Sequence, residues 1–169
     1  MPRFIFFKGL YSTLDLYTDE MLRICRERGY DSFVLHTTQG EDASCMHISE
    51  EQEKEEREDL LRFLKEPVTA AVGFGNMGLR YEMDGIGNIW DAFAVPYIDV
   101  MMDHPFHFSG IFRYAAKQTA LLCPDRNHVN YIRRFFPEIA CADFLPHAGI
   151  ELPGEKKPIR ERGIEVLYA

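Results

Sequence analysis

Five residues with acid–base chemistry follow short apolar runs of this sequence, at points where strands are expected to end. They are Asp103, His104, His107, His128 and His147. An imidazole titrates near neutral pH, so it can accept or donate a proton, and a neighbouring carboxylate can share that work. We therefore expect these side chains to face a polar cleft. The alternative is that Asp103 caps its loop and one of the histidines is packed.

The first three of these residues, in the segment DHPFH at 103–107, also allow a metal site. Carboxylate and imidazole are both ligands of divalent ions. Pro105 prevents the HxxH spacing from being helical. A small metal-dependent hydrolase would therefore require Asp103, His104 and His107 to converge through the geometry of a loop. We keep this hydrolase as an alternative, and our main hypothesis includes no metal site.

A glycine-rich stretch supplies a second candidate segment. Gly73–Gly78 reads GFGNMG, which matches the GxGxxG pattern, and it follows an apolar run. The dinucleotide-binding form of this pattern requires a helix directly after it, whose N-terminus binds the pyrophosphate. The residues that follow, LRYEMDGIG, are not typical of a helix. We therefore expect a flexible loop that faces the substrate and contains Asn76, with a plain turn as the alternative.

The elements that must position these residues are strands alternating with helices. Strands are expected at Arg3–Phe7, Ser32–His36, Val68–Val72, Tyr97–Met102, Thr119–Cys123 and Ala140–Leu145, and helices at Leu14–Arg28, from Ser49 to about Lys65, and at Arg126–Phe136. This alternation predicts right-handed crossovers and a doubly wound parallel sheet, in a three-layer α/β/α fold. Ligands of such sheets bind beyond the carboxyl ends of the strands, which selects the loops with Gly9, Asn76 and the histidines.

The composition disfavours several classes of protein. The 169 residues carry a formal net charge of −8, so nucleic acid and anionic lipid are poor partners. No apolar run approaches the roughly 20 residues that span a bilayer, and the N-terminal run FIFF is too short for a signal peptide. Four cysteines without a CxxC pair are expected to be reduced, with Cys123 and Cys141 buried. We predict a cytoplasmic protein without a membrane span or a nucleic-acid partner.

The last residues have the composition of a linker followed by a new strand. Residues 153–169 are first polar and charged, with prolines, and then apolar within Ile164–Tyr168. We expect residues 1–152 to form one domain and residues 153–169 to form a linker and the first strand of a following domain. The alternative is that this strand folds back onto the sheet.

Four segments together resemble a known family. They are Asp103–Pro105 (DHP), Cys123–Tyr131 (CPDRNHVNY), Phe144–Gly149 (FLPHAG) and Pro158–Ala169 (PIRERGIEVLYA). This combination is similar to bacterial glycosyltransferases related to the spore-maturation glycosyltransferase proteins, which have the two-domain GT-B architecture. The resemblance covers roughly residues 67–169. Residues 1–66 agree with it only in the alternation of strands and helices.

The resemblance implies that the chain is the N-terminal, Rossmann-like, acceptor-side half of an enzyme that uses a nucleotide sugar. In that architecture the C-terminal domain holds the nucleotide sugar, and a base from the N-terminal domain often deprotonates the acceptor hydroxyl. The resemblance makes Asp103 or His104 the candidate base. It makes Gly9, Asn76, His107, His128 and His147 candidates for binding the sugar acceptor or small-molecule substrate. The domain alone would bind no cofactor and would lack full activity.

A non-catalytic ligand-binding domain of the flavodoxin type is a further alternative. A phosphoacceptor receiver with this kind of fold would need acidic residues directly after the first strand. The chain has Lys8 and Gly9 there. The sequence therefore disfavours a receiver domain and leaves a ligand-binding domain open.

Overall fold

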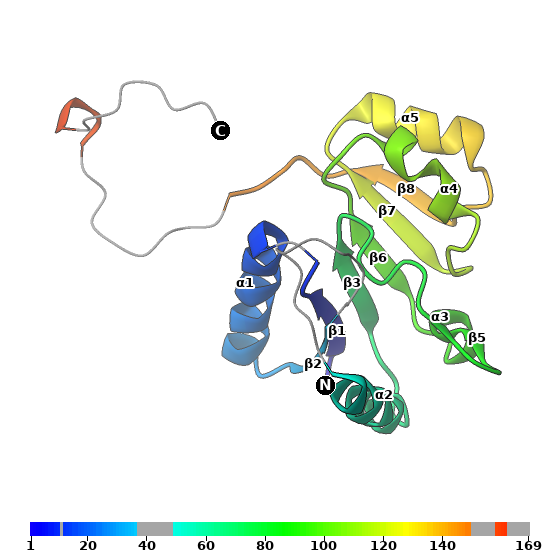
Figure 1. Ribbon diagram of the computed structural model, residues 1–169. Helices are drawn as coiled ribbons and strands as arrows, with labels where there is room; N and C mark the ends of the chain where they lie inside the picture. Colours follow the sequence, from blue (N-terminus) through cyan, green and yellow to red (C-terminus); the bar gives the residue numbers. More distant parts are fainter. Residues whose placement is uncertain (11, 37–48, 150–157, 162–169) are drawn as a thin grey trace.

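The computed structural model describes residues 1–10, 12–36, 49–149 and 158–161. Its centre is a six-stranded parallel sheet with the strand order β2-β1-β3-β6-β7-β8 (Figure 1). The strands are β1 (Arg3–Lys8), β2 (Asp31–His36), β3 (Ala70–Phe74), β6 (Tyr97–Val100), β7 (Thr119–Cys123) and β8 (Cys141–Phe144). The predicted α/β fold with a doubly wound parallel sheet is confirmed.

Helices cover both faces of this sheet. They are α1 (Ser12–Arg28), α2 (Glu50–Phe63), α3 (Ile89–Ala92), α4 (Ser109–Phe112) and α5 (Arg126–Phe135), with short 3-10 turns η1 (Pro105–Phe108) and η2 (Ile159–Glu161). The chain steps from β1 to β2 in one direction and from β2 through β3 to β8 in the other. Right-handed crossovers therefore place α1 on one face and α2 and α5 on the opposite face. Within the described residues, no helix is both long and apolar enough to cross a membrane.

The two faces of the sheet carry cores of different size. On the α2 and α5 face, Phe7, Tyr97 and Leu121 belong to the large core, which includes Leu60 of α2 and Ile132 of α5. On the α1 face, a smaller core joins Phe6, Ala70 and Val72 to Cys25 of α1. Burial on both faces is typical of parallel sheets and explains why the strands read as continuous apolar runs.

Beyond α1, the same face carries an apolar groove of about 450 Å³. Its walls come from β3, β6 and β7, from α1, and from the segment after β8. The side chains include Tyr17, Met21, Val72, Phe74, Ile98, Val100, Leu122 and His147.

Predicted helix starts agree with the structure. Ser49 forms a capping box with Gln52, since the Ser49 hydroxyl accepts from Gln52 N–H and the Gln52 side chain accepts from Ser49 N–H. Asp125 caps α5 by accepting from Asn127 N–H at 2.6 Å. These side chains satisfy backbone donors that a helix leaves unpaired in its first turn.

Some expectations were wrong in detail. The third strand begins at Ala70, two residues later than expected, and the short antiparallel pair β4 (Glu82–Met83) and β5 (Gly87–Asn88) was not predicted. Cys123 is buried as expected, but Cys141 is exposed. Cys141 begins the edge strand β8, on the face that α1 covers only near β1 and β3. The predicted strand Ile164–Tyr168 and most of the predicted linker lie outside the described residues.

Candidate functional site

The predicted site residues lie beyond the carboxyl ends of the strands, in two groups. We call His104, His128 and His147 the histidine cluster; these residues follow β6, β7 and β8. The second group surrounds a cavity near the ends of β1, β2 and β3 and contains Asn76. We call this cavity the switch-point pocket, because the crossovers change face between β1 and β3.

Ring packing joins two members of the histidine cluster. The ring centroids of His104 and His128 lie 4.4 Å apart, with the planes at 70°. Tyr131, one turn further along α5, packs its ring against His104 at 5.4 Å. His147 approaches from the segment after β8 and places Nε2 at 3.2 Å from the carbonyl oxygen of Met101. The three predicted imidazoles therefore come together beyond the carboxyl ends of β6, β7 and β8.

Backbone contacts fix the tautomers of two of these imidazoles. His104 begins η1 as its N-cap, and its Nδ1 accepts from Phe106 N–H at 3.1 Å. A neutral His104 then carries its proton on Nε2 and can only donate from that atom. The carbonyl of Met101 can only accept, so His147 must donate from Nε2. A neutral His147 keeps its lone pair on Nδ1, so the two rings present opposite hydrogen-bonding groups.

His128 lies in the first turn of α5, and both other imidazoles are near enough to affect its ionisation. Burial lowers the pKa of its imidazole, and repulsion from His104 and His147 lowers it further, whereas Asp125 raises it. Its Nδ1 is buried and has no hydrogen-bond partner among the described residues. The lowered pKa makes the ring neutral at physiological pH.

The other two candidate residues of the segment 103–107 do not join the cluster. Asp103 and His107 are exposed, and the His107 ring lies between those of Phe106 and Phe108, at 6.0 and 6.5 Å. In the described part of the chain, no group of three histidine, cysteine or carboxylate side chains could hold a metal ion. The convergence that the hydrolase alternative requires is therefore not present.

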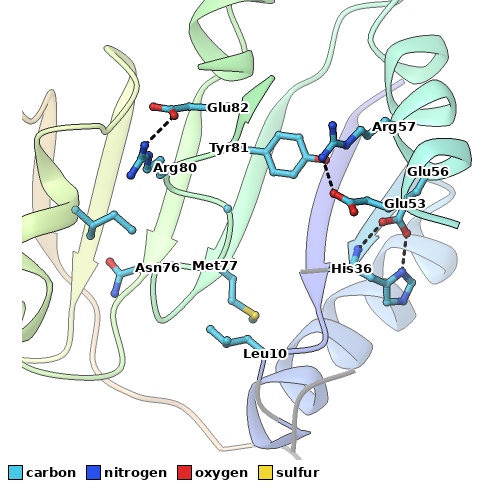
Figure 2. Close-up of a pocket in the computed structure, with 12 residues that line it drawn as sticks. Leu10, His36, Glu53, Glu56, Arg57, Asn76, Met77, Arg80, Tyr81 and Glu82 are labelled. Carbon is cyan, nitrogen blue, oxygen red and sulfur yellow. Dashed lines mark hydrogen bonds and ion pairs between the residues drawn. The ribbon is translucent and has the colours of Figure 1, made fainter. Parts of the chain in front are cut away.

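The switch-point pocket is a cavity of about 160 Å³ between α2 and the loop after β3. Figure 2 shows its charged side chains on two sides, with apolar and aromatic side chains between them. Its lining includes Leu10, His36, Glu53, Glu56, Arg57, Asn76, Met77, Gly78, Arg80, Tyr81, Glu82 and Ile111.

Every charged or imidazole side chain of this lining belongs to a pair. Glu56 binds His36 twice: Oε1 lies 2.6 Å from Nδ1, and Oε2 accepts from the backbone N–H at 3.0 Å. Arg57 pairs with Glu53 one turn earlier on α2. Arg80 pairs with Glu82 at 3.0 Å on the opposite side. Because a carboxylate only accepts, His36 donates from Nδ1, and a neutral His36 carries its lone pair on Nε2.

A buried polar group anchors the loop that forms the pocket wall. Asp99 of β6 is fully buried, and its Oδ1 accepts from Asn76 N–H at 2.8 Å and from the Tyr97 hydroxyl at 3.2 Å. The Tyr97 hydroxyl also lies 2.6 Å from Met77 O, so its single proton is shared between these two acceptors. Burial raises the pKa of Asp99 to about 7, although the bonds from Asn76 and Tyr97 oppose this rise.

The predicted loop residues Asn76 and Gly9 have different surroundings. Asn76 is buried in a left-handed conformation, with φ of 69°, which asparagine adopts more readily than most residues. Neither polar atom of its amide has a partner among the described residues. Gly9 is also buried, and its N–H donates to Asp15 Oδ1 at 3.0 Å near the start of α1. Its role in substrate binding stays a prediction.

Sequence reasoning missed the charged half of this site. His36 ends β2, so the rule that selected His104 and His147 could also have selected it. Glu56 and Arg57 lie in the highly charged first half of α2, where the sequence pattern does not show which side of the helix meets a cavity. Asp99 was hidden inside an apolar run, where a single carboxylate gives no periodic signal.

Comparisons with known proteins give no relative. No protein-family model, no curated protein and no solved structure matches this chain. The resemblance to glycosyltransferases therefore stays a prediction, and function is inferred from the geometry of the site.

Proposed function

We propose that this chain is the acceptor-side N-terminal half of a nucleotide-sugar-dependent glycosyltransferase. The observation that carries this proposal is the convergence of His104, His128 and His147 at the carboxyl edge of a parallel sheet. This edge is where such sheets bind ligands. The three segments that contribute these histidines are also segments on which the family resemblance rests.

The chemistry of the cluster suits an acceptor hydroxyl. A hydroxyl both donates and accepts, and the cluster offers a donor at His104 Nε2 and a lone pair at His147 Nδ1. We assign the base to His147, because the Nδ1 lone pair of the predicted base His104 is occupied by Phe106 N–H. The hydroxyl proton would pass to His147 Nδ1 as the oxygen bonds to the anomeric carbon of the donor sugar, and the bond from that carbon to the nucleoside diphosphate would break, which releases the nucleotide.

The remaining parts of the proposal concern the partner half and its setting. The nucleotide sugar would be held by a C-terminal domain. The half described here would bind the acceptor and would need no cofactor of its own. We place the protein in the cytoplasm. The free thiols of Cys25, Cys123 and Cys141 are consistent with a reducing compartment.

Calorimetric titration with saccharides and nucleotides tests this proposal. Neutral mono- and disaccharides should bind this chain, whereas UDP, GDP and their sugar conjugates should not. His128→Phe keeps a ring against His104 but removes both nitrogens, so it should weaken saccharide binding at least fivefold. Asn130→Ala, on the exposed side of the same helix, is the matched control and should bind like the wild type. Tighter binding of a nucleotide than of any saccharide would contradict the proposal.

A second candidate is a non-catalytic ligand-binding domain of the flavodoxin type. The order β2-β1-β3-β6-β7 corresponds to the 2-1-3-4-5 order of that fold, with β8 as an added edge strand. Fold alone does not decide function. The same titration separates the two candidates, because this second one predicts binding of flavin mononucleotide and no response to saccharides.

A further inference from the structure

We infer that the switch-point pocket is a binding site for one neutral, polyhydroxylated ring, such as a single sugar unit. This inference rests on the proposed function and adds a second contact region for the acceptor. It draws on the size of the cavity, the pairing of its charges, its apolar walls and the amide of Asn76.

The size of the cavity limits the ligand. Pockets for drug-sized ligands have volumes of about 300–1,000 Å³. The switch-point pocket has about 160 Å³, so it is too small to enclose a whole nucleotide or flavin. A single six-membered ring with its hydroxyl groups is a ligand of suitable size.

The paired charges of the lining disfavour an ionic ligand and favour a neutral polar one. Among the described residues, the pairs His36–Glu56, Arg57–Glu53 and Arg80–Glu82 account for every charged or imidazole side chain of the wall. A phosphate would compete with carboxylates for the arginines, and a cation would compete with arginines for the carboxylates. Hydroxyl groups avoid this competition, because each can accept from a guanidinium and donate to a carboxylate in the same pair.

The pocket also offers individual groups that a hydroxyl can bind. Glu56 holds His36 with Nδ1 as the donor, so a neutral His36 keeps Nε2 as an acceptor for a hydroxyl. Asn76 lies in the opposite wall (Figure 2), where its amide is buried and has no partner among the described residues. Buried polar groups in proteins are normally paired, so this amide indicates a missing partner. A ring hydroxyl is a group that could be that partner.

The apolar part of the lining fits the carbon face of a sugar ring. Leu10, Met77 and Ile111 also line the cavity, and Tyr81 adds an aromatic ring that packs on Trp90 at 5.8 Å. Burial raises the pKa of the Tyr81 phenol, so this side chain is neutral at physiological pH and can both donate and accept. The wall therefore combines the apolar and polar contacts that one sugar unit requires.

Histidine side-chain NMR resolves binding at this pocket, because His36 is a reporter inside it. The probes are methyl glucoside, which is neutral, and glucose 6-phosphate, glucuronate and glucosamine, which keep the ring but add a charge. We expect methyl glucoside to shift the His36 resonances and each charged analogue to bind at least tenfold more weakly. A charged analogue that binds more tightly than the neutral ring would overturn the inference.

Variants of α2 test whether the paired charges make the site. Arg57→Met leaves Glu53 unpaired and should weaken methyl glucoside binding at least tenfold. The double variant Glu53→Gln and Arg57→Met removes both charges without a change in net charge, and it should also weaken binding, because the guanidinium donors are lost. Glu51→Gln, an exposed position of the same helix, is the matched control and should not change binding. Unchanged binding in Arg57→Met would overturn the inference.

The same spectra separate this inference from the proposed function. If neutral saccharides shift His104, His128 or His147 but not His36, the pocket is not a sugar site, while the proposed function stands. If UDP-glucose shifts His36 or the histidine cluster and saccharides do not, the acceptor-side assignment fails.

Discussion

The switch-point pocket and the histidine cluster, which both lie beyond the carboxyl ends of the strands, are built in different ways. The switch-point pocket has charged side chains in pairs. The loop after β3 that forms its wall is held by a hydrogen bond from Asn76 N–H to the buried carboxyl of Asp99. The histidine cluster has partly exposed imidazoles on the segments after β6, β7 and β8, and backbone groups orient them. Substitutions in the frame of the pocket should therefore disturb folding, whereas substitutions in the cluster should mainly change ionisation and binding.

Strand β6 connects these two regions. Asp99 accepts from Asn76 N–H in the wall of the pocket, and the carbonyl of Met101, two residues later, accepts from His147. An acceptor with more than one sugar unit could therefore contact both regions, with β6 as the common support.

The largest expected effect concerns the frame of the pocket. In Gly73→Ala, the added Cβ would lie 2.2 Å from both Met77 O and the Tyr97 hydroxyl. One of these contacts is with backbone, so relief requires the loop to move, and we expect a loss of roughly 3 kcal/mol or more. Urea unfolding measures this loss. Gly110→Ala, whose Cβ meets nothing within 4 Å among the described atoms, is the control and should be neutral or slightly stabilising. Equal effects of the two substitutions would contradict a rigid frame.

The next effect is a pH dependence that Asp99 imposes on the fold. Burial raises the pKa of Asp99 from 3.8 to about 7, so between these values the folded chain keeps a proton that the unfolded chain loses. Stability should therefore fall as pH rises through this window, by up to roughly 1.4 kcal/mol per pH unit from this group.

Asp99→Asn isolates this contribution, because its amide oxygen can still accept from Asn76 N–H. Urea unfolding of both proteins between pH 4.5 and 7.5 should show the stability of the variant improving relative to wild type as pH rises. Parallel pH profiles of the two proteins would show that Asp99 does not carry this proton.

Substitution of His104 separates its structural and electrostatic roles. His104→Ala removes the N-cap of η1 and should cost roughly 0.5–1 kcal/mol, whereas His104→Asn can still accept from Phe106 N–H and should cost less. Both substitutions remove the repulsion that lowers the pKa of His128, so this pKa should rise in both. Thermal denaturation and an NMR titration of His128 measure the two effects. A His128 pKa that is unchanged in both variants would show that the two rings do not interact.

The smallest effect on stability is expected for Arg80→Gln. Arg80 and Glu82 form a solvent-exposed pair, and such pairs contribute little to folding. Thermal denaturation should therefore show no measurable change, while saccharide binding at His36 becomes weaker. A clear loss of stability would show that Arg80 supports the fold, which would contradict a role in binding alone.

The fold was predictable because each of its signals is local. Capping residues such as Ser49 and Asp125 mark helix starts, and apolar runs mark strands that are buried on both faces. The strand order was not predicted, since it depends on which runs pair in three dimensions. The exposed position of Cys141 follows from this order, because it lies on the edge strand.

The candidate site was predictable only in part. The rule that ligands meet strand ends selected His104, His128 and His147, which the structure brings together. The same rule did not separate them from Asp103 and His107, because which of these side chains meet depends on the path of the loop after β6. The His36–Glu56 pair joins residues that are 20 positions apart in the sequence, so no spacing pattern indicates it.

A single histidine-selective NMR titration tests the central claim, that the carboxyl edge holds a neutral acceptor. The chain is titrated with a neutral disaccharide and, in a second sample, with UDP-glucose. We predict that the disaccharide shifts His36 together with at least one of His104, His128 and His147, and that UDP-glucose shifts none of them. Shifts produced by UDP-glucose but not by the disaccharide would contradict the account.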